Sequence, residues 1–206
     1  MVAGINAALR RVPTWPLYPL GCIPAVLFYY QGLTGQLGAD PIRAIEHELG
    51  EWALRLLILV LLITPLLNVT RVNLIRFRRA IGLLAFIYVT LHLLTYLVLD
   101  QQFYWSQIWQ DLTKRPYIII GMSGFLAMVP LAITSNNASL RRLGARAWRQ
   151  LHRLTYFVAV AGAVHYLLLV KAWPLEPFVY LGIILALLAY RLGRRLGTRS
   201  RRRPAT

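Results

Sequence analysis

The sequence predicts an all-α integral membrane protein with six transmembrane helices. Of its 206 residues, 58% are hydrophobic and 12% aromatic, and the mean hydropathy of +0.54 is far above that of a soluble domain of this size. Six runs lack Asp, Glu, Lys and Arg, and each approaches the roughly 20 residues that a helix needs to cross a bilayer. Backbone groups in lipid must be satisfied within their own segment, which favours helices over open strands.

Each span is built on one of these runs, and the connections are short. The charge-free runs, in order, are 12–39, 56–70, 80–99, 116–140, 154–170 and 177–190. The first is rich in Trp, Tyr and Pro and lacks a clear small-residue cleavage site, so we interpret it as a retained helix and not a signal peptide. The predicted spans lie near Trp15 to Gln31, Gly50 to Leu67, Ala80 to Leu99, Pro116 to Thr134, Leu151 to Val170 and Leu175 to Tyr190.

The net charge of +16 is unevenly distributed over this arrangement. All seven acidic residues fall at one end of the spans, and only a few of the 23 basic residues do. Those few are Arg43, Arg55, Lys114, Arg115 and Lys171. By the positive-inside rule, residues 1–14 and the basic tail 191–206 are cytoplasmic, and residues 15–190 form a multi-pass membrane domain. Topology explains the charge, so we expect membrane lipid and no nucleic acid as a partner.

The single cysteine and the absence of several sequence motifs exclude some classes of cofactor site. The lone Cys22 cannot form an internal disulfide, and no CxxC or CxxCH is present, so covalent c-type haem, zinc and iron–sulfur sites are unsupported. Any haem would be b-type. Without GxGxxG or GxxxxGK[ST], we expect no NAD(P)H oxidation through a domain of this chain.

Two histidines lie within otherwise apolar spans. His92 is eight residues before Asp100, about 12 Å below the outer end of its helix, and His165 is six residues before Lys171, about 9 Å below. An ionisable side chain within the membrane is a functional-site hypothesis by default. Two imidazoles at one depth predict the axial ligands of a low-spin haem. The alternative is that each bonds a backbone carbonyl or a nearby hydroxyl of the core.

His152 lies at the cytoplasmic edge of the fifth span. It precedes His165 by 13 residues, which turns an ideal helix by about 220°, so the two share a face only if the helix bends, for instance at Gly162. We consider a second haem, a flavin or quinone contact, or a side chain placed among arginines. The positions that would complete a second histidine pair, 13 and 14 residues before His92, hold Arg79 and Arg78.

His47 lies among acidic residues at the outer start of the second span. His47 and Glu51 are one helical turn apart, which suits a weak metal or proton site. The alternative is a solvated helix start with acids near its N-terminus. The acids at this end also predict a negative patch for docking a partner.

Several stretches between Leu37 and Tyr190 resemble one known group. These are LGADPIRAIEH (37–47), LLITPL (61–66), RRAIGLLAFIYVTLHLLTY (78–96), KRPYIIIG (114–121) and WRQLHRLTYFVAVAGAVHYLLLVK (148–171). They resemble the haem-binding membrane subunits of bacterial periplasmic protein-methionine-sulfoxide reductase systems, within the ferric-reductase-like transmembrane group. Relative to larger ferric reductases, the chain lacks a flavin and NAD domain and the second histidine of the third span.

The resemblance implies a location in a bacterial inner membrane and a b-type haem with His92 and His165 as axial iron ligands. It also implies a role for His152 in a second haem or in electron entry. It also implies FMN, a periplasmic molybdopterin catalytic subunit that repairs oxidised methionine, and electrons from the quinone pool or a cytosolic flavin reductase. We therefore predict an electron-transfer subunit. The alternatives are a cytochrome b subunit of another oxidoreductase or a ferric reductase, and a haem-free transporter or assembly factor.

Overall fold

The computed structural model describes residues 2–170, 172 and 174–200, and helices joined by turns and short irregular segments make up this part of the chain. The helices are α1 (Val2–Arg11), α2 (Leu17–Leu33), α3 (Pro41–Thr70), α4 (Arg78–Leu94), α5 (Trp105–Lys114), α6 (Pro116–Ile133), α7 (Asn137–Leu151), α8 (Leu154–Leu169) and α9 (Leu175–Ser200). A 3-10 turn, η1 (Ile75–Phe77), precedes α4, and a π-helical segment, η2 (Thr95–Asp100), continues it.

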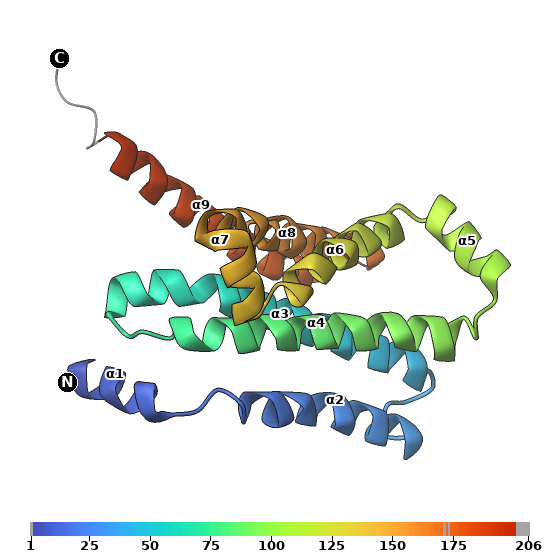
Figure 1. The fold of residues 1–206 in the computed structure, drawn as a ribbon. Coiled ribbons are helices and arrows are strands. Elements are labelled where there is room, and N and C mark those ends of the chain that lie inside the picture. The colour runs from blue at the N-terminus through green and yellow to red at the C-terminus, as the bar shows by residue number, and fades with distance from the viewer. Residues whose placement is uncertain (1, 171, 173, 201–206) are drawn as a thin grey trace.

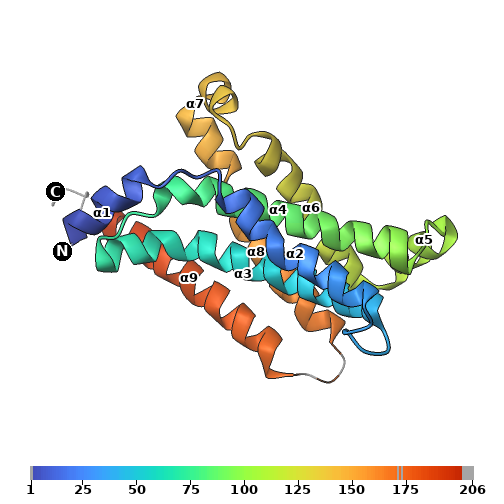
Figure 2. The ribbon, with the colours of Figure 1, turned by 90° about the horizontal axis from the view of Figure 1, so that it is seen from below.

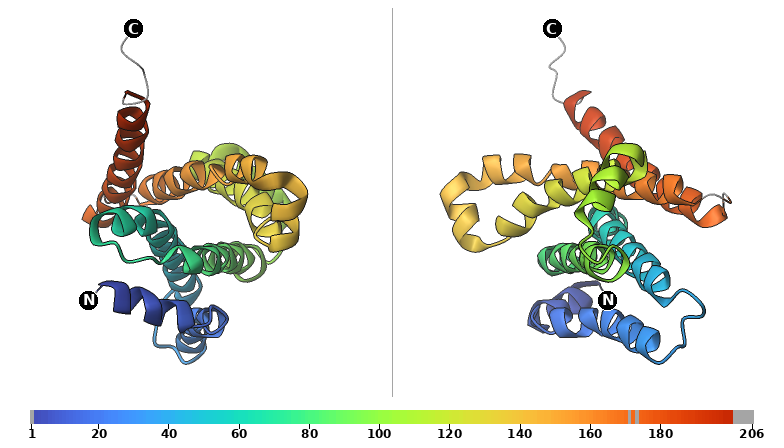
Figure 3. Two further views of the ribbon diagram at one scale, coloured as in Figure 1. Left: turned by 60° about the vertical axis from the view of Figure 1, so that its left-hand side comes forward. Right: turned by 90° about the vertical axis from the view of Figure 1, so that its right-hand side faces the viewer.

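The long helices form one bundle centred on α3. Figure 1 shows α1, the α3–α4 connection and the last turns of α9 at one end, and α5 at the other. Figure 2 shows the same ends from below, with the α2–α3 connection on the α5 side. In the end-on views of Figure 3, α2 and α9 lie at opposite edges, separated by α3. We call the end with α5 the outer end and the opposite one the inner end.

Four helices have the length and composition to cross a membrane. They are Pro41–Thr70, Ile75–Asp100 (α4 with its flanking turns), Pro116–Ile133 and Leu175–Arg194, and α8 is a shorter apolar helix of 16 residues. These coincide with the second to sixth predicted spans. The first predicted span corresponds to α2, which has 17 residues and contains Pro24. Six spans therefore remain a prediction, while a multi-pass membrane protein is supported by the four long helices.

Element boundaries differ from the prediction where polar residues extend a helix. α3 begins nine residues before the predicted Gly50, because the Asp40 side chain caps the N–H of Arg43 and Pro41 occupies the first turn. α9 continues through Arg191 to Ser200, so the first part of the predicted tail is helical, and residues 201–206 lie outside the described residues. The amphipathic helices α1, α5 and α7 were not predicted, because they are too short and too polar to be recognised as membrane spans.

Pro65 interrupts the hydrogen-bond ladder of α3, and Arg191 compensates for it. Residue 65 would normally donate its N–H to the carbonyl of Leu61, but proline has no N–H. In the structure Arg191 Nη2 of α9 donates to that carbonyl at 2.6 Å. The arginine therefore satisfies a backbone acceptor within the bundle and ties α9 to α3.

We predict that Arg191→Met lowers stability by about 1–3 kcal/mol, because the Leu61 carbonyl loses its partner. In a Pro65→Ala background residue 65 regains its N–H, so the same substitution should cost measurably less. Denaturant unfolding of the four variants in detergent checks this. Equal costs in the two backgrounds would contradict the assignment.

Candidate functional site: a facing histidine pair

His92 on α4 and His165 on α8 face each other inside the bundle. His92 lies in the last turn of α4 and His165 in the second half of α8, and the two ring centres are 6.2 Å apart with planes at 86°. The common depth predicted from the sequence therefore brings the imidazoles together. Both lie deep among the helices, yet neither ring is fully buried, so protein atoms do not pack on every side of them.

Each imidazole is fixed by a backbone carbonyl of a neighbouring helix. His92 Nδ1 lies 2.9 Å from the carbonyl oxygen of Glu46 on α3, and His165 Nδ1 lies 2.7 Å from that of Tyr117 on α6. A carbonyl only accepts, so Nδ1 carries the proton in both rings and Nε2 keeps its lone pair. An imidazole whose Nδ1 donates to a carbonyl is oriented as metal-bound histidines usually are.

Two glycines allow these helices to approach the rings. A Cβ on Gly121 of α6 would lie 2.7 Å from His165 Nδ1, and one on Gly50 of α3 would lie 3.4 Å from His92 Nδ1. Each glycine follows the accepting carbonyl by four residues, since Glu46 precedes Gly50 and Tyr117 precedes Gly121. The pairs α3–α4 and α6–α8 thus repeat one arrangement. This arrangement was not predicted from the sequence. Gly121 lies within an apolar run, but Gly50 lies between Glu48 and Glu51, and a carbonyl four residues earlier gives no signal in its side chain.

His152 takes part in a separate contact. It lies in the turn between α7 and α8, where its Nε2 is 3.1 Å from Thr134 Oγ1. Its ring stacks on that of Trp148, with 3.8 Å between the two ring centres. Burial, helped by the positive charges of Arg78 and Arg79, lowers the pKa of His152 to about 4, so the imidazole is neutral at pH 7. The structure does not bring His152 to His165.

Arg79 also forms a side-chain hydrogen bond at the inner end of the bundle. Its Nη1 donates to Asn137 Oδ1 at 2.8 Å, which joins the start of α4 to the start of α7. This arginine stands where a second histidine of the third span would be required. Its contact supports a structural role at the inner end.

His47 belongs to a polar network at the outer end. Glu51 lies 3.3 Å from His47 and 2.5 Å from Arg55, and it accepts a hydrogen bond of 2.8 Å from Tyr166 on α8. Arg55 also donates to Tyr180 on α9 at 2.8 Å. Among the described residues no cluster of three or more His, Cys, Asp or Glu side chains suits a metal ion. The network instead holds α3, α8 and α9 together.

Two other outer acids are also paired. Asp111 is buried, lies 3.0 Å from Arg115 and accepts a bond from Tyr96, and Asp40 lies 3.5 Å from Arg43. The sequence shows the charges but not these short-range partners. The negative patch at the outer end stays a prediction, since these ion pairs leave the net charge of that end unchanged.

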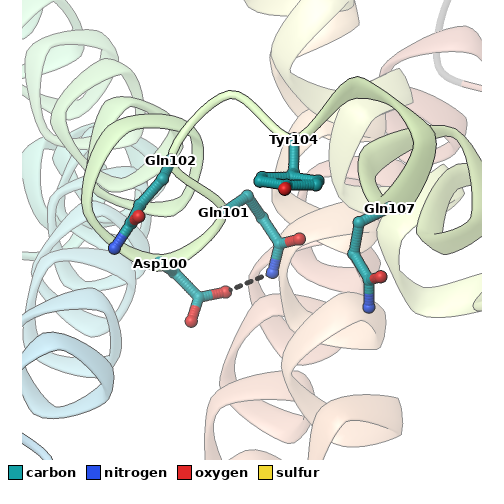
Figure 4. Close-up of a pocket in the computed structure, with 5 residues that line it drawn as sticks. All are labelled: Asp100, Gln101, Gln102, Tyr104 and Gln107. Carbon is teal, nitrogen blue, oxygen red and sulfur yellow. Dashed lines mark hydrogen bonds between the residues drawn. The ribbon is translucent and has the colours of Figure 1, made fainter.

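A polar surface cavity of about 360 Å³ lies in the loop between η2 and α5. Figure 4 shows its lining side chains, with the Asp100 carboxylate accepting a bond from Gln101 at 2.7 Å. The lining is Asp100, Gln101, Gln102, Tyr104 and Gln107. It contains neither histidine, so it is distinct from the histidine pair.

The chain is similar to well-defined relatives. Residues 49–163 match the family described as ferric reductase like transmembrane component, a range that includes His92 and His152. Proteins named protein-methionine-sulfoxide reductase heme-binding subunit MsrQ from Brucella ovis, Brucella canis and Brucella abortus (strain S19) are each 53% identical over 200 residues, covering 94% of this chain and 90% of theirs. The chain therefore belongs to the ferric reductase like transmembrane family, and within it to the MsrQ heme-binding subunits.

Proposed function

We propose that this protein is a membrane electron-transfer subunit that binds a b-type haem between His92 and His165 and passes electrons to a methionine-sulfoxide reductase at its outer side. The facing histidine pair, with a ring separation of 6.2 Å, carries the proposal. Membership of the MsrQ family supports the haem and the reductase.

The spacing of the rings fits axial ligation. A histidine nitrogen bonds a transition metal at about 2.0–2.1 Å and lies about 1.1 Å from its ring centre, so two imidazoles on opposite sides of one ion have centres about 6 Å apart. The observed 6.2 Å agrees with this separation. The Nδ1–carbonyl bonds alone would also suit two core histidines, so the spacing of the two rings is the observation that favours ligation.

The residues of the site keep both rings ready for this role. A haem held by two imidazoles supplies reversible one-electron transfer without an open coordination position. The Glu46 and Tyr117 carbonyls hold the Nδ1 protons, which keeps each Nε2 basic and limits ring rotation. The site can therefore carry electrons but offers no place for substrate chemistry, which belongs to the partner.

The proposal also includes the orientation of the protein in the membrane, its electron donor, its partner and a second cofactor. We place both termini in the cytoplasm, on the arginine-rich end, and His92 and His165 toward the outside. The partner outside is a molybdopterin catalytic subunit, and the donor is the quinone pool or a cytosolic flavin reductase. FMN is the second cofactor, and His152 at the inner end is the histidine placed to serve electron entry or a second haem.

The proposal is tested by reconstituting the full chain in nanodiscs with the methionine-sulfoxide reductase encoded by the same organism. We expect sulfoxide reduction with a quinol or with a flavin reductase and NADH, and expect it to fall at least tenfold in His165→Ala but not in the matched outer-end variant His47→Ala. Reduction of ferric chelates with no sulfoxide reduction would favour a ferric reductase instead. A colourless protein from haem-replete cells would favour the haem-free alternative.

A further inference from the structure

Four side chains at the outer end connect the surroundings of one histidine to those of the other. Asp111 of α5 accepts a hydrogen bond of 2.9 Å from the Tyr96 hydroxyl through one carboxylate oxygen, and its other oxygen lies 3.0 Å from Nε of Arg115. Arg115 in turn donates to the Tyr117 hydroxyl on α6 at 3.2 Å. Figure 1 shows α5 at the outer end, where the chain passes from η2 to α6. We call these four residues the α5 network.

Each end of the α5 network lies next to one member of the histidine pair. Tyr96 follows His92 by four residues and belongs to the π-helical segment η2, a kind of segment that is frequent at functional sites. Tyr117 accepts the Nδ1 proton of His165 through its backbone carbonyl at 2.7 Å, and the two rings are 6.0 Å apart. The network therefore joins the turn after His92 to the group that orients His165.

The Tyr117 carbonyl lies in the first turn of α6, where a helix is least rigid. α6 begins at Pro116, and no side chain among the described residues caps its start. Helix ends fray, so a carbonyl there is held less firmly than one in a helix interior. Glu46, the corresponding acceptor, lies further inside α3, whose start has a side-chain cap. The bond from Arg115 to the Tyr117 hydroxyl thus anchors the residue whose carbonyl holds His165.

Asp111 is the central member of the α5 network. Its side chain is only 5% exposed, and each of its two oxygens has a partner. A carboxylate is buried at low cost only when it is paired and hydrogen-bonded, and removing one member of such a pair is strongly destabilising. The carboxylate therefore holds Tyr96 and Arg115 in fixed positions on opposite sides of it.

We propose that Asp111 is a positioning residue for both haem ligands. It fixes the turn that follows His92 and, through the rest of the α5 network, the carbonyl that sets the ring plane of His165. The inference rests on the proposed ligation of haem by this pair. It adds that the angle of 86° between the two ring planes depends on a buried carboxylate of α5. Hydrogen bonding around the axial ligands is one of the means by which a protein tunes a haem.

Electron paramagnetic resonance of the oxidised, haem-loaded full chain in nanodiscs tests the proposal, because the g values of a low-spin ferric haem depend on the angle between its imidazole planes. With planes at 86°, the wild type should give a strongly anisotropic low-spin signal. Asp111→Asn keeps the size of the side chain but removes its charge, so it should shift or broaden that signal. The matched control Asp100→Asn removes an exposed acid of the same end, which bonds Gln101, and should leave the signal unchanged.

A second variant keeps the test decisive if Asp111→Asn does not fold. Tyr117→Phe removes one hydroxyl and leaves the carbonyl in place, so it should shift the signal in the same direction by a smaller amount. A wild-type signal in Tyr117→Phe, and in Asp111→Asn where that variant folds, would overturn the proposal, as would an equal shift in Asp100→Asn. A haem-loaded wild type without a low-spin signal would contradict the haem ligation itself, and this inference with it.

Discussion

Replacing either His92 or His165 by alanine is expected to abolish the low-spin haem spectrum of the purified protein. Their ring centres are 6.2 Å apart and both Nδ1 atoms donate to carbonyls, so each ring keeps one lone pair, on Nε2, for a metal ion. Loss of one axial ligand leaves a single imidazole, which weakens haem binding and changes the spin state. Oxidised and dithionite-reduced absorption spectra, with haem content per protein, measure the effect.

Two other histidines provide matched controls for this experiment. His47→Ala disturbs the outer network with Glu51, and His152→Ala removes the contact with Thr134 at the inner end. Neither contacts the facing pair through a hydrogen bond, so both variants should keep the main Soret band and the reduced α band. A full low-spin spectrum in both His92→Ala and His165→Ala would contradict the ligand assignment. A partial loss in His152→Ala alone would indicate a second haem.

The histidine pair could be predicted because membrane thickness converts sequence position into depth. Counting from Asp100 and Lys171 was enough to place His92 and His165 at one level, since a helix rises by a fixed amount per residue. The same reasoning located five of the helices, because a long charge-free run has few alternatives in lipid.

What sequence reasoning could not supply depends on contacts between helices. The carbonyl of Glu46 carries no signal in its side chain, and Glu51 looks like a free acid until Arg55 and Tyr166 are placed beside it. Pro65 predicts an orphaned carbonyl at Leu61, but not that Arg191, 130 positions along the chain, satisfies it. The amphipathic helices α5 and α7 are too short and polar to be recognised from hydropathy.

Gly121→Ala is expected to lower haem content strongly although the residue binds nothing. The added Cβ would lie 2.7 Å from His165 Nδ1 and 2.9 Å from Cε1, so the ring or α6 must move. The ring cannot move without losing the bond to Tyr117, which already holds Nδ1 at 2.7 Å. Overpacking of this kind costs about 1–3 kcal/mol, which corresponds to haem affinity about 5- to 150-fold weaker if the whole cost falls on the haem-bound state.

A graded series distinguishes this steric effect from general destabilisation. Gly50→Ala should have a smaller effect, because its Cβ would lie 3.4 Å from His92 Nδ1, and Gly182→Ala should have none, because nothing lies within 4 Å. Haem titration of the apoproteins, with helix content by circular dichroism, gives the order. If Gly121→Ala keeps its helices and binds haem as Gly182→Ala does, His165 is not held against α6 as the structure shows. If the loss of haem affinity decreases in the order Gly121, Gly50, Gly182, the two close glycines help to fix the histidine ligands. The physical reason is that the helix backbone must lie near each ring for its carbonyl to reach Nδ1.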